Sequence, residues 1–161
     1  MRYTPRMTGN DLLIRQLNRA QEGFLRMLAK VPADKLTWQP AAELRSAADQ
    51  AQEVATMVSY SWALYADRRM DWDMDRYMAH KATARQFDSH EKIEAELRQN
   101  TARLVEFVQN LPTAELSAPV QMPWPGEYVV ADTVQYHVWN MAYHEGQIAA
   151  ILMRLGIDPM G

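Results

Sequence analysis

A short stretch near the C-terminus, "YHVWNMAYHEGQI", carries polar residues whose types and spacing could do chemistry. Positions i, i+3, i+7 and i+10 share one face of a helix. They are His137, Asn140, His144 and Gln147. Imidazole nitrogens and amide oxygens can bind metal ions, but buried side chains of the same types also satisfy ordinary core hydrogen bonds. The pattern alone leaves both interpretations open.

Several other catalytic signatures are missing. "HEGQI" begins like the zinc-binding HExxH helix, but Ile148 stands where the second histidine belongs. The sequence holds no cysteine, which excludes disulfides, thiolate ligands and cysteine nucleophiles. It also holds no glycine-rich phosphate loop and no G-x-S-x-G motif.

Four periodic segments must position these groups. Apolar residues recur at helical spacing over about 10–30, 43–67, 89–111 and 132–156, with two polar links between the second and fourth segments. Pro32 closes the first segment and Gly156 follows the last, as helix ends require. We predict an all-α four-helix bundle with long links between helices 2 and 3 and between helices 3 and 4. One domain would span residues 1–161.

Helix starts are read from capping residues. Asn10 and Asp132 are predicted N-caps of the first and last helices. Asp88, with Glu91 three residues on, resembles a capping box at the start of the third helix.

Charge and composition indicate which classes of binding partner to expect for this chain. The net charge is −3 and the basic residues form no run, so we expect no nucleic acid and no anionic membrane surface as partner. No stretch approaches the roughly 18 apolar residues of a membrane span, and the start of the sequence lacks the apolar core of a signal peptide. We expect a soluble, cytoplasmic protein.

Two segments resemble the DinB/YfiT-like family. "LTWQPAAELRSAADQAQEVATM" is similar to the family's stretch that leads into helix 2, and "NMAYHEGQIAAILMRLGIDP" is similar to its last helix. The resemblance covers almost the whole chain and implies a four-helix bundle with a metal site. It also implies a metal-dependent enzyme, such as a thiol-dependent transferase or a hydrolase, whose metal would activate a bound thiol or water.

The resemblance places the family's three histidine ligands on Glu53, Asn140 and His144, so only the last is retained. Oxygen ligands in place of imidazole lower the expected affinity for zinc or nickel and favour manganese or magnesium. The implied divalent ion (Mn, Mg, Zn or Ni) is therefore weakly bound or absent. His137 is seven residues from His144, about 10.5 Å along the helix, and is expected to line the pocket or support the ligands.

The alternative is a non-catalytic bundle that has lost the metal and binds a small ligand, or serves as a dimeric interaction module. Glu53 and His144 would then form an ion pair between helices, with Asn140 bridging. In either case Gln147, Trp124 and Tyr128 are expected around the pocket, the two aromatic residues as its roof.

A homodimer is also expected, on separate grounds. Trp62, Trp72 and Tyr77 fall at the end of helix 2 and on a polar link, and large apolar groups in one exposed patch often mark an interface. The competing interpretation is that this link folds back over its own bundle.

Overall fold

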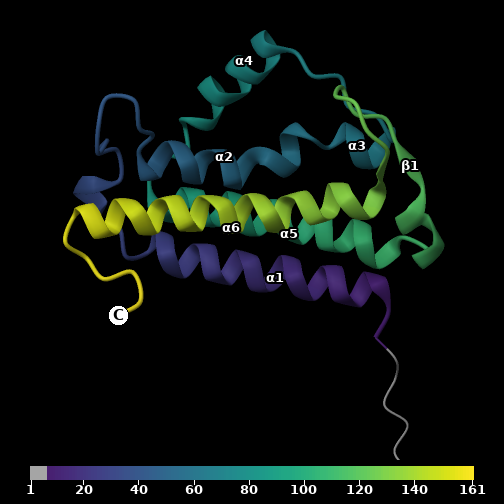
Figure 1. Cartoon of the computed structure of the whole chain (residues 1–161), viewed down its shortest axis with the longest axis horizontal. Coiled ribbons are helices and arrows are strands. Elements are labelled where there is room, and N and C mark those ends of the chain that lie inside the picture. Colours follow the sequence, from purple (N-terminus) through teal and green to yellow (C-terminus); the bar gives the residue numbers. More distant parts are fainter. Residues whose placement is uncertain (1–6) are drawn as a thin grey trace, which may run out of the picture.

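A computed structural model describes residues 7–161 and places four long helices side by side (Figure 1). They are α1 (Gly9–Leu28), α2 (Ala47–Tyr60), α5 (His90–Asn110) and α6 (Val130–Arg154). Helix α1 packs against α5 and α6, and α2 packs against the same two helices from the other side. This arrangement confirms the predicted all-α four-helix bundle.

The core consists of the apolar stripes that the sequence shows. Leu17 and Phe24 of α1 are fully buried, as are Leu104 of α5 and Ile148 of α6. Burying one such side chain stabilises the fold by about 1.5–3 kcal/mol relative to leaving it in water. The spacing of these residues therefore determines which face of each helix points inward.

The helix starts differ from the predicted caps. Thr8, not Asn10, caps α1 in a capping box with Asp11. The amide of Asn10 is buried instead and donates to the carbonyl oxygen of Val108 at 2.7 Å, which ties α1 to the end of α5. Ser89, not Asp88, caps α5 by accepting a hydrogen bond from the backbone N–H of Lys92.

Helix α6 begins two residues earlier than predicted and ends as predicted. Its N-cap is Val129, whose backbone N–H donates to Asp132 at 2.9 Å. Gly156, with φ of +76°, follows the C-cap and adopts the left-handed conformation that glycine favours.

The second predicted helix is shorter than expected and is followed by two further helices. Ser61 is the C-cap of α2, and its hydroxyl donates to the carbonyl oxygen of Met57 at 2.8 Å. The short α3 (Ala63–Ala66) follows, and then α4 (Met74–Ala84) lies over α2 (Figure 1). This polar link, which shows no apolar periodicity in the sequence, thus holds about three turns of helix.

The two long links are joined to each other at one end of the bundle. β1 (Pro119–Val120) pairs antiparallel with β2 (Tyr128–Val129), and Arg69 forms an isolated bridge with Gln121. Two short 3-10 turns, η1 (Ala33–Lys35) and η2 (Thr113–Ser117), complete the connections. This pairing fixes the position of the segment before α6.

The aromatic residues of the first long link do not form one exposed patch. The guanidinium of Arg103 covers the ring of Trp62 at 3.4 Å, and Tyr77 contacts the ring of Tyr60. Trp72 is 43% exposed and lines a cavity. The link therefore folds back over its own bundle, and these residues do not supply the surface on which the expected homodimer rested.

Among residues 7–161, no helix combines the length and the apolar character that a membrane span needs.

Candidate functional site

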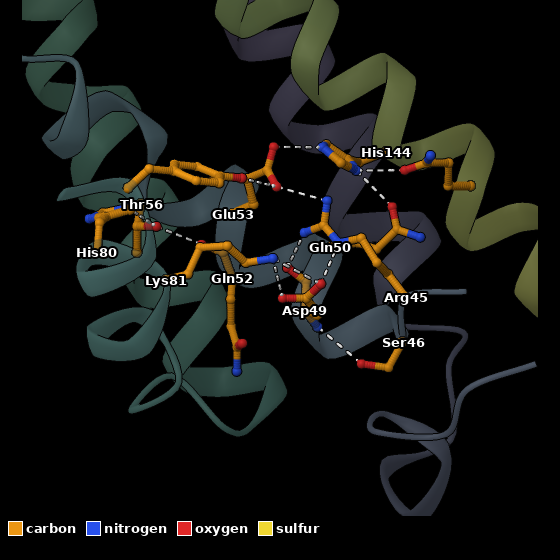
Figure 2. A network of polar contacts seen from close by, with 12 residues as sticks. Arg45, Ser46, Asp49, Gln50, Gln52, Glu53, Thr56, His80, Lys81 and His144 are labelled. Carbon is orange, nitrogen blue, oxygen red and sulfur yellow. Dashed lines mark hydrogen bonds and ion pairs between the residues drawn. The ribbon is translucent and has the colours of Figure 1, made fainter. Parts of the chain in front are cut away.

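A chain of polar contacts joins α2, α4, α6 and the segment before α2 (Figure 2). The Nε2 atom of His144 on α6 lies 3.2 Å from Oε1 of Glu53 on α2. The Nη1 atom of Arg45 lies 2.8 Å from Oε2 of the same carboxylate. The side chains of His144 and Glu53 are 2% and 12% exposed. The carboxylate is thus held between an imidazole and a guanidinium, largely out of contact with water.

Acceptor oxygens surround the His144 ring on both sides. Its Nδ1 atom lies 2.7 Å from Oε1 of Gln50 and 2.7 Å from Oε1 of Gln147. Both ring nitrogens of His144 therefore face oxygen atoms of neighbouring side chains, Nδ1 the two amides and Nε2 the carboxylate. These nitrogens are the atoms through which an imidazole would bind a metal ion.

Glu53 is ionised throughout the physiological range. Burial would raise the pKa of its carboxyl group, but the hydrogen bond with His144 and the charge of Arg45 outweigh it and lower the pKa to about 2. The hydroxyl of Tyr77 also approaches Oε2 at 3.4 Å.

The network continues from Arg45 to α4. Arg45 donates from Nε to the carboxylate of Asp49 and from Nη2 to its backbone oxygen, the latter at 2.8 Å. Lys81 of α4 lies 3.0 Å from the same carboxylate. Positive and negative groups therefore alternate from Lys81 to Glu53, and each of these charges has an opposite neighbour.

A cavity of about 440 Å³ opens beside Glu53 at the end of the bundle where the two links meet. Helices α2, α3 and α4, the 119–129 segment and the start of α6 form its walls. Six of its lining residues are aromatic: Tyr60, Trp72, Tyr77, Trp124, Tyr128 and Tyr136. Trp124 and Tyr128, expected as the roof of a pocket, are thus among them.

The acidic side chains of this cavity are not balanced by basic ones among the described lining residues. Glu53 and Asp132 contribute carboxylates, and none of the described lining residues is lysine or arginine. The hydroxyl oxygen of Tyr60 is buried and has no hydrogen-bond partner within residues 7–161. Burial raises the pKa of this phenol, so it stays protonated and offers a hydrogen-bond donor. The cavity is thus rich in aromatic side chains, and the buried hydroxyl of Tyr60 on its wall lacks a hydrogen-bond partner among residues 7–161.

His137 lines the same cavity from α6. Its Nε2 atom lies 3.4 Å from the hydroxyl oxygen of Ser61. Burial lowers the pKa of the ring to about 3, which keeps it neutral at physiological pH.

Asn140 lies apart from the Glu53–His144 contact. Its side chain is buried and borders a small interior space among Leu17, Val54 and Leu104. Within residues 7–161 it makes no hydrogen bond to Glu53 or His144; Gln50 and Gln147 take that place around the ring.

The sequence model of the DinB family matches residues 7–161. The chain belongs to the DinB family. Three solved structures share its fold at low sequence identity. The colibactin self-resistance protein ClbS, in complex with a dsDNA, has a TM-score of 0.71 and 12% identity, over 92% of this chain and 98% of that one. No curated protein matches the sequence.

The other two structures come from Bacillus subtilis and Enterococcus faecalis. The DinB-like protein YjoA from Bacillus subtilis has a TM-score of 0.64 and 12% identity, over 90% of this chain and 92% of that one. A conserved protein from Enterococcus faecalis has a TM-score of 0.65 and 16% identity, over 94% and 99% of the two chains. These values show a shared DinB fold.

One expectation from composition is wrong. Net charge and the lack of a basic run led us to exclude nucleic acid as a partner, yet ClbS, which has this fold, is in complex with double-stranded DNA. The DinB fold is therefore compatible with DNA binding. A charge summed over the chain does not exclude it, because phosphate contacts depend on local positive groups.

The residues present in this DinB chain do not fit a divalent metal. Among residues 7–161 no three histidine, cysteine, aspartate or glutamate side chains are grouped so that they could hold one. The Glu53 carboxylate already has Arg45 as its cation, and both nitrogens of His144 face oxygens. Asn140, at the third position implied by the resemblance, borders a small interior space lined mainly by apolar side chains.

Arg45, Gln50 and Tyr60 were not among the site residues predicted from the sequence. Arg45 and Asp49 precede Glu53 at steps of four residues, the spacing at which side chains on one helix face meet. That spacing could have predicted a polar network that includes Arg45. No sequence pattern predicts the unpaired hydroxyl of Tyr60, because its environment depends on how α4 covers α2.

Proposed function

We propose that this DinB protein is a metal-independent receptor for a small, largely apolar organic molecule. One observation carries the proposal: Arg45, Gln50 and Gln147 saturate the Glu53–His144 pair, while the aromatic cavity beside it is open. A site closed by its own ion pair has no free ligand positions for catalysis at a metal. The open cavity retains the capacity to bind.

The lining favours a particular chemical class. A volume of about 440 Å³ is in the range of small-molecule sites, and the aromatic side chains present flat apolar faces. A ligand carboxylate or phosphate would meet Glu53 and Asp132 with no lysine or arginine among the described lining residues to oppose them. The ligand is therefore neutral or cationic, and contains a ring and an acceptor group for the hydroxyl of Tyr60.

Ligand capture is tested with the neutral dye N-phenyl-1-naphthylamine. We expect binding with increased dye fluorescence and quenching of tryptophan emission, since Trp72 and Trp124 line the cavity. Met122→Trp fills the cavity from its wall and is expected to weaken dye binding at least about tenfold, which corresponds to about 1.4 kcal/mol. Met160→Trp adds the same group at an 87% exposed position and is the matched control. Equal affinity in both variants would contradict the proposal.

Metal independence is tested separately by calorimetry and elemental analysis. We expect the purified chain to hold no stoichiometric zinc or nickel and to show no heat of binding when titrated with either ion. The double variant Glu53→His with Asn140→His supplies the imidazoles that the family resemblance implies, and is expected to bind zinc more tightly than the natural sequence. Stoichiometric zinc in the untreated natural chain would count against a metal-independent role.

A further inference from the structure

A second cavity, of about 280 Å³, borders the polar network at the start of α2 and the end of α6. Gln50 and Gln147, which contact Nδ1 of His144, lie in its wall. The aromatic cavity has Glu53 in its wall, which contacts Nε2 of the same ring. Among the residues that the structure describes, none lines both cavities. The second cavity, here called the glutamine cavity, is therefore a separate site.

The two glutamines hold the imidazole with their oxygens, which leaves their amide nitrogens as hydrogen-bond donors. Oε1 of Gln50 lies 2.7 Å from Nδ1 of His144 (Figure 2), and Oε1 of Gln147 lies at the same distance of 2.7 Å. Because the oxygen and nitrogen of an amide diverge from one carbon atom, an oxygen held at His144 directs the NH2 group elsewhere. Gln50 is only 5% exposed, and neither Nε2 atom has a hydrogen-bond partner within residues 7–161. A donor buried in this way requires an acceptor, so the cavity is suited to a ligand oxygen.

Arginine side chains in the same wall favour a negatively charged ligand. Arg154, the last residue of α6, lines the cavity and forms no ion pair within residues 7–161. Arg45 uses three of the five N–H groups of an arginine on Asp49 and Glu53, which leaves two. Glu43 is the one carboxylate among the described lining residues, and it is exposed. The cavity thus combines an unpaired guanidinium with amide donors, and carboxylates bind to such groups in proteins.

We propose that the glutamine cavity binds a small organic carboxylate with an uncharged, apolar body. The carboxylate oxygens accept hydrogen bonds from the two glutamine amides and from the guanidinium of Arg154, and charge-assisted bonds of this kind are about twice as strong as neutral ones. Pro40, Leu44 and Ile151 supply apolar wall for the rest of the ligand. The volume suits a body of one ring and a short chain, and a second negative charge would meet Glu43.

Two molecules of the same shape, 3-phenylpropionate and its neutral amide, test the proposal by NMR. We expect the acid to shift the side-chain NH2 signals of Gln50 and Gln147 in the isotope-labelled natural chain. The loss of each signal in Gln50→Glu or Gln147→Glu assigns it. The neutral amide is expected to bind at least about tenfold more weakly, since it lacks the charge. N-phenyl-1-naphthylamine, the probe of the aromatic cavity, is expected to stay bound, which distinguishes the two sites.

Arg154→Gln removes the unpaired guanidinium. We expect it to weaken the binding of 3-phenylpropionate at least about tenfold, because the amide that replaces it has no charge. Arg26→Gln, also at an exposed arginine in the last turn of a long helix, is the matched control and leaves the affinity unchanged. Circular dichroism checks that both variants fold.

Two further variants test the sign of the ligand charge. Gln147→Glu keeps an oxygen for His144 but puts a carboxylate oxygen in place of the NH2 group, so we expect no binding of 3-phenylpropionate. Glu43→Gln removes an opposing charge and is expected to raise the affinity roughly threefold. Absence of binding to the natural chain, equal binding of acid and amide, displacement of the dye, or an affinity unchanged by both Arg154→Gln and Gln147→Glu overturns the proposal.

Discussion

Glu53→Gln is expected to lower the free energy of unfolding by about 3 kcal/mol, a large effect for one polar substitution. The change removes the negative charge but keeps the size of the side chain. The guanidinium of Arg45 and the ring of His144 then face a neutral amide at a site where Glu53 itself is 12% exposed. The lowered pKa of Glu53, about 2, points to a loss of similar size, because one pKa unit corresponds to about 1.4 kcal/mol. Urea unfolding at neutral pH measures it.

Glu94→Gln on α5 is the matched control. Glu94 also pairs with an arginine, Arg98, at 2.8 Å, but its side chain is 48% exposed. Water screens such a pair, so the expected loss is below about 1 kcal/mol.

A double variant tests whether Glu53 acts through His144. In a chain that already carries His144→Gln, Glu53→Gln should lower the free energy of unfolding by less than it does in the natural chain, since each change removes the same contact. Strict additivity of the two losses would show that the contact at 3.2 Å contributes nothing to stability.

The four long helices could be predicted from the sequence because their apolar spacing has a direct physical consequence. Ile93, Leu97 and Leu104 recur on one face of α5, and all three are buried. Burial of that face determines how the helix lies against α1 and α2. The helical spacing of apolar residues was therefore enough to predict the four-helix bundle without knowledge of its tertiary contacts.

Helix α4 could not be recognised in the same way. Ala84 is its one buried residue, so it has no apolar stripe. Polar contacts hold it on α2 instead: Lys81 with Asp49, and His80 with the hydroxyl of Thr56 at 2.9 Å. Contacts of this kind depend on the tertiary arrangement and leave no periodic pattern in the sequence.

Part of the candidate site could be predicted from the sequence. Family resemblance gave the register that sets Glu53 of α2 against His144 of α6. It did not indicate that Arg45 would be the cation beside Glu53, because Arg45 precedes α2 and its reach depends on how the chain enters that helix at Ser46. One arginine thus changes a metal-ligand pattern into a closed ion pair.

Stability is expected to fall by about 2 kcal/mol between pH 7 and pH 5, because of His137. The ring is buried and neutral, with its pKa lowered from 6.5 to about 3 by burial. The unfolded chain binds this proton below pH 6.5 and the folded chain does not until about pH 3, so acid favours unfolding throughout that window. His80, whose pKa burial also lowers, acts in the same direction.

Glu53 adds a second loss at lower pH. Its pKa is lowered from 4.5 to about 2, so its stabilisation is complete above pH 4.5 and disappears as the pH falls towards 2. Of the two groups, His137 alone lowers stability between pH 6.5 and pH 4.5, and both act between pH 4.5 and about pH 3.

His137→Gln separates the two contributions. The amide cannot gain the proton and can still reach the hydroxyl of Ser61, so we expect this variant to lose much less stability between pH 7 and pH 5 than the natural chain. His90→Gln leaves the buried ring in place and should keep the full loss. Urea unfolding of all three proteins at the two pH values measures the difference. If His137→Gln lost as much stability as the natural chain, the acid sensitivity would have to arise elsewhere than in the buried neutral ring of α6.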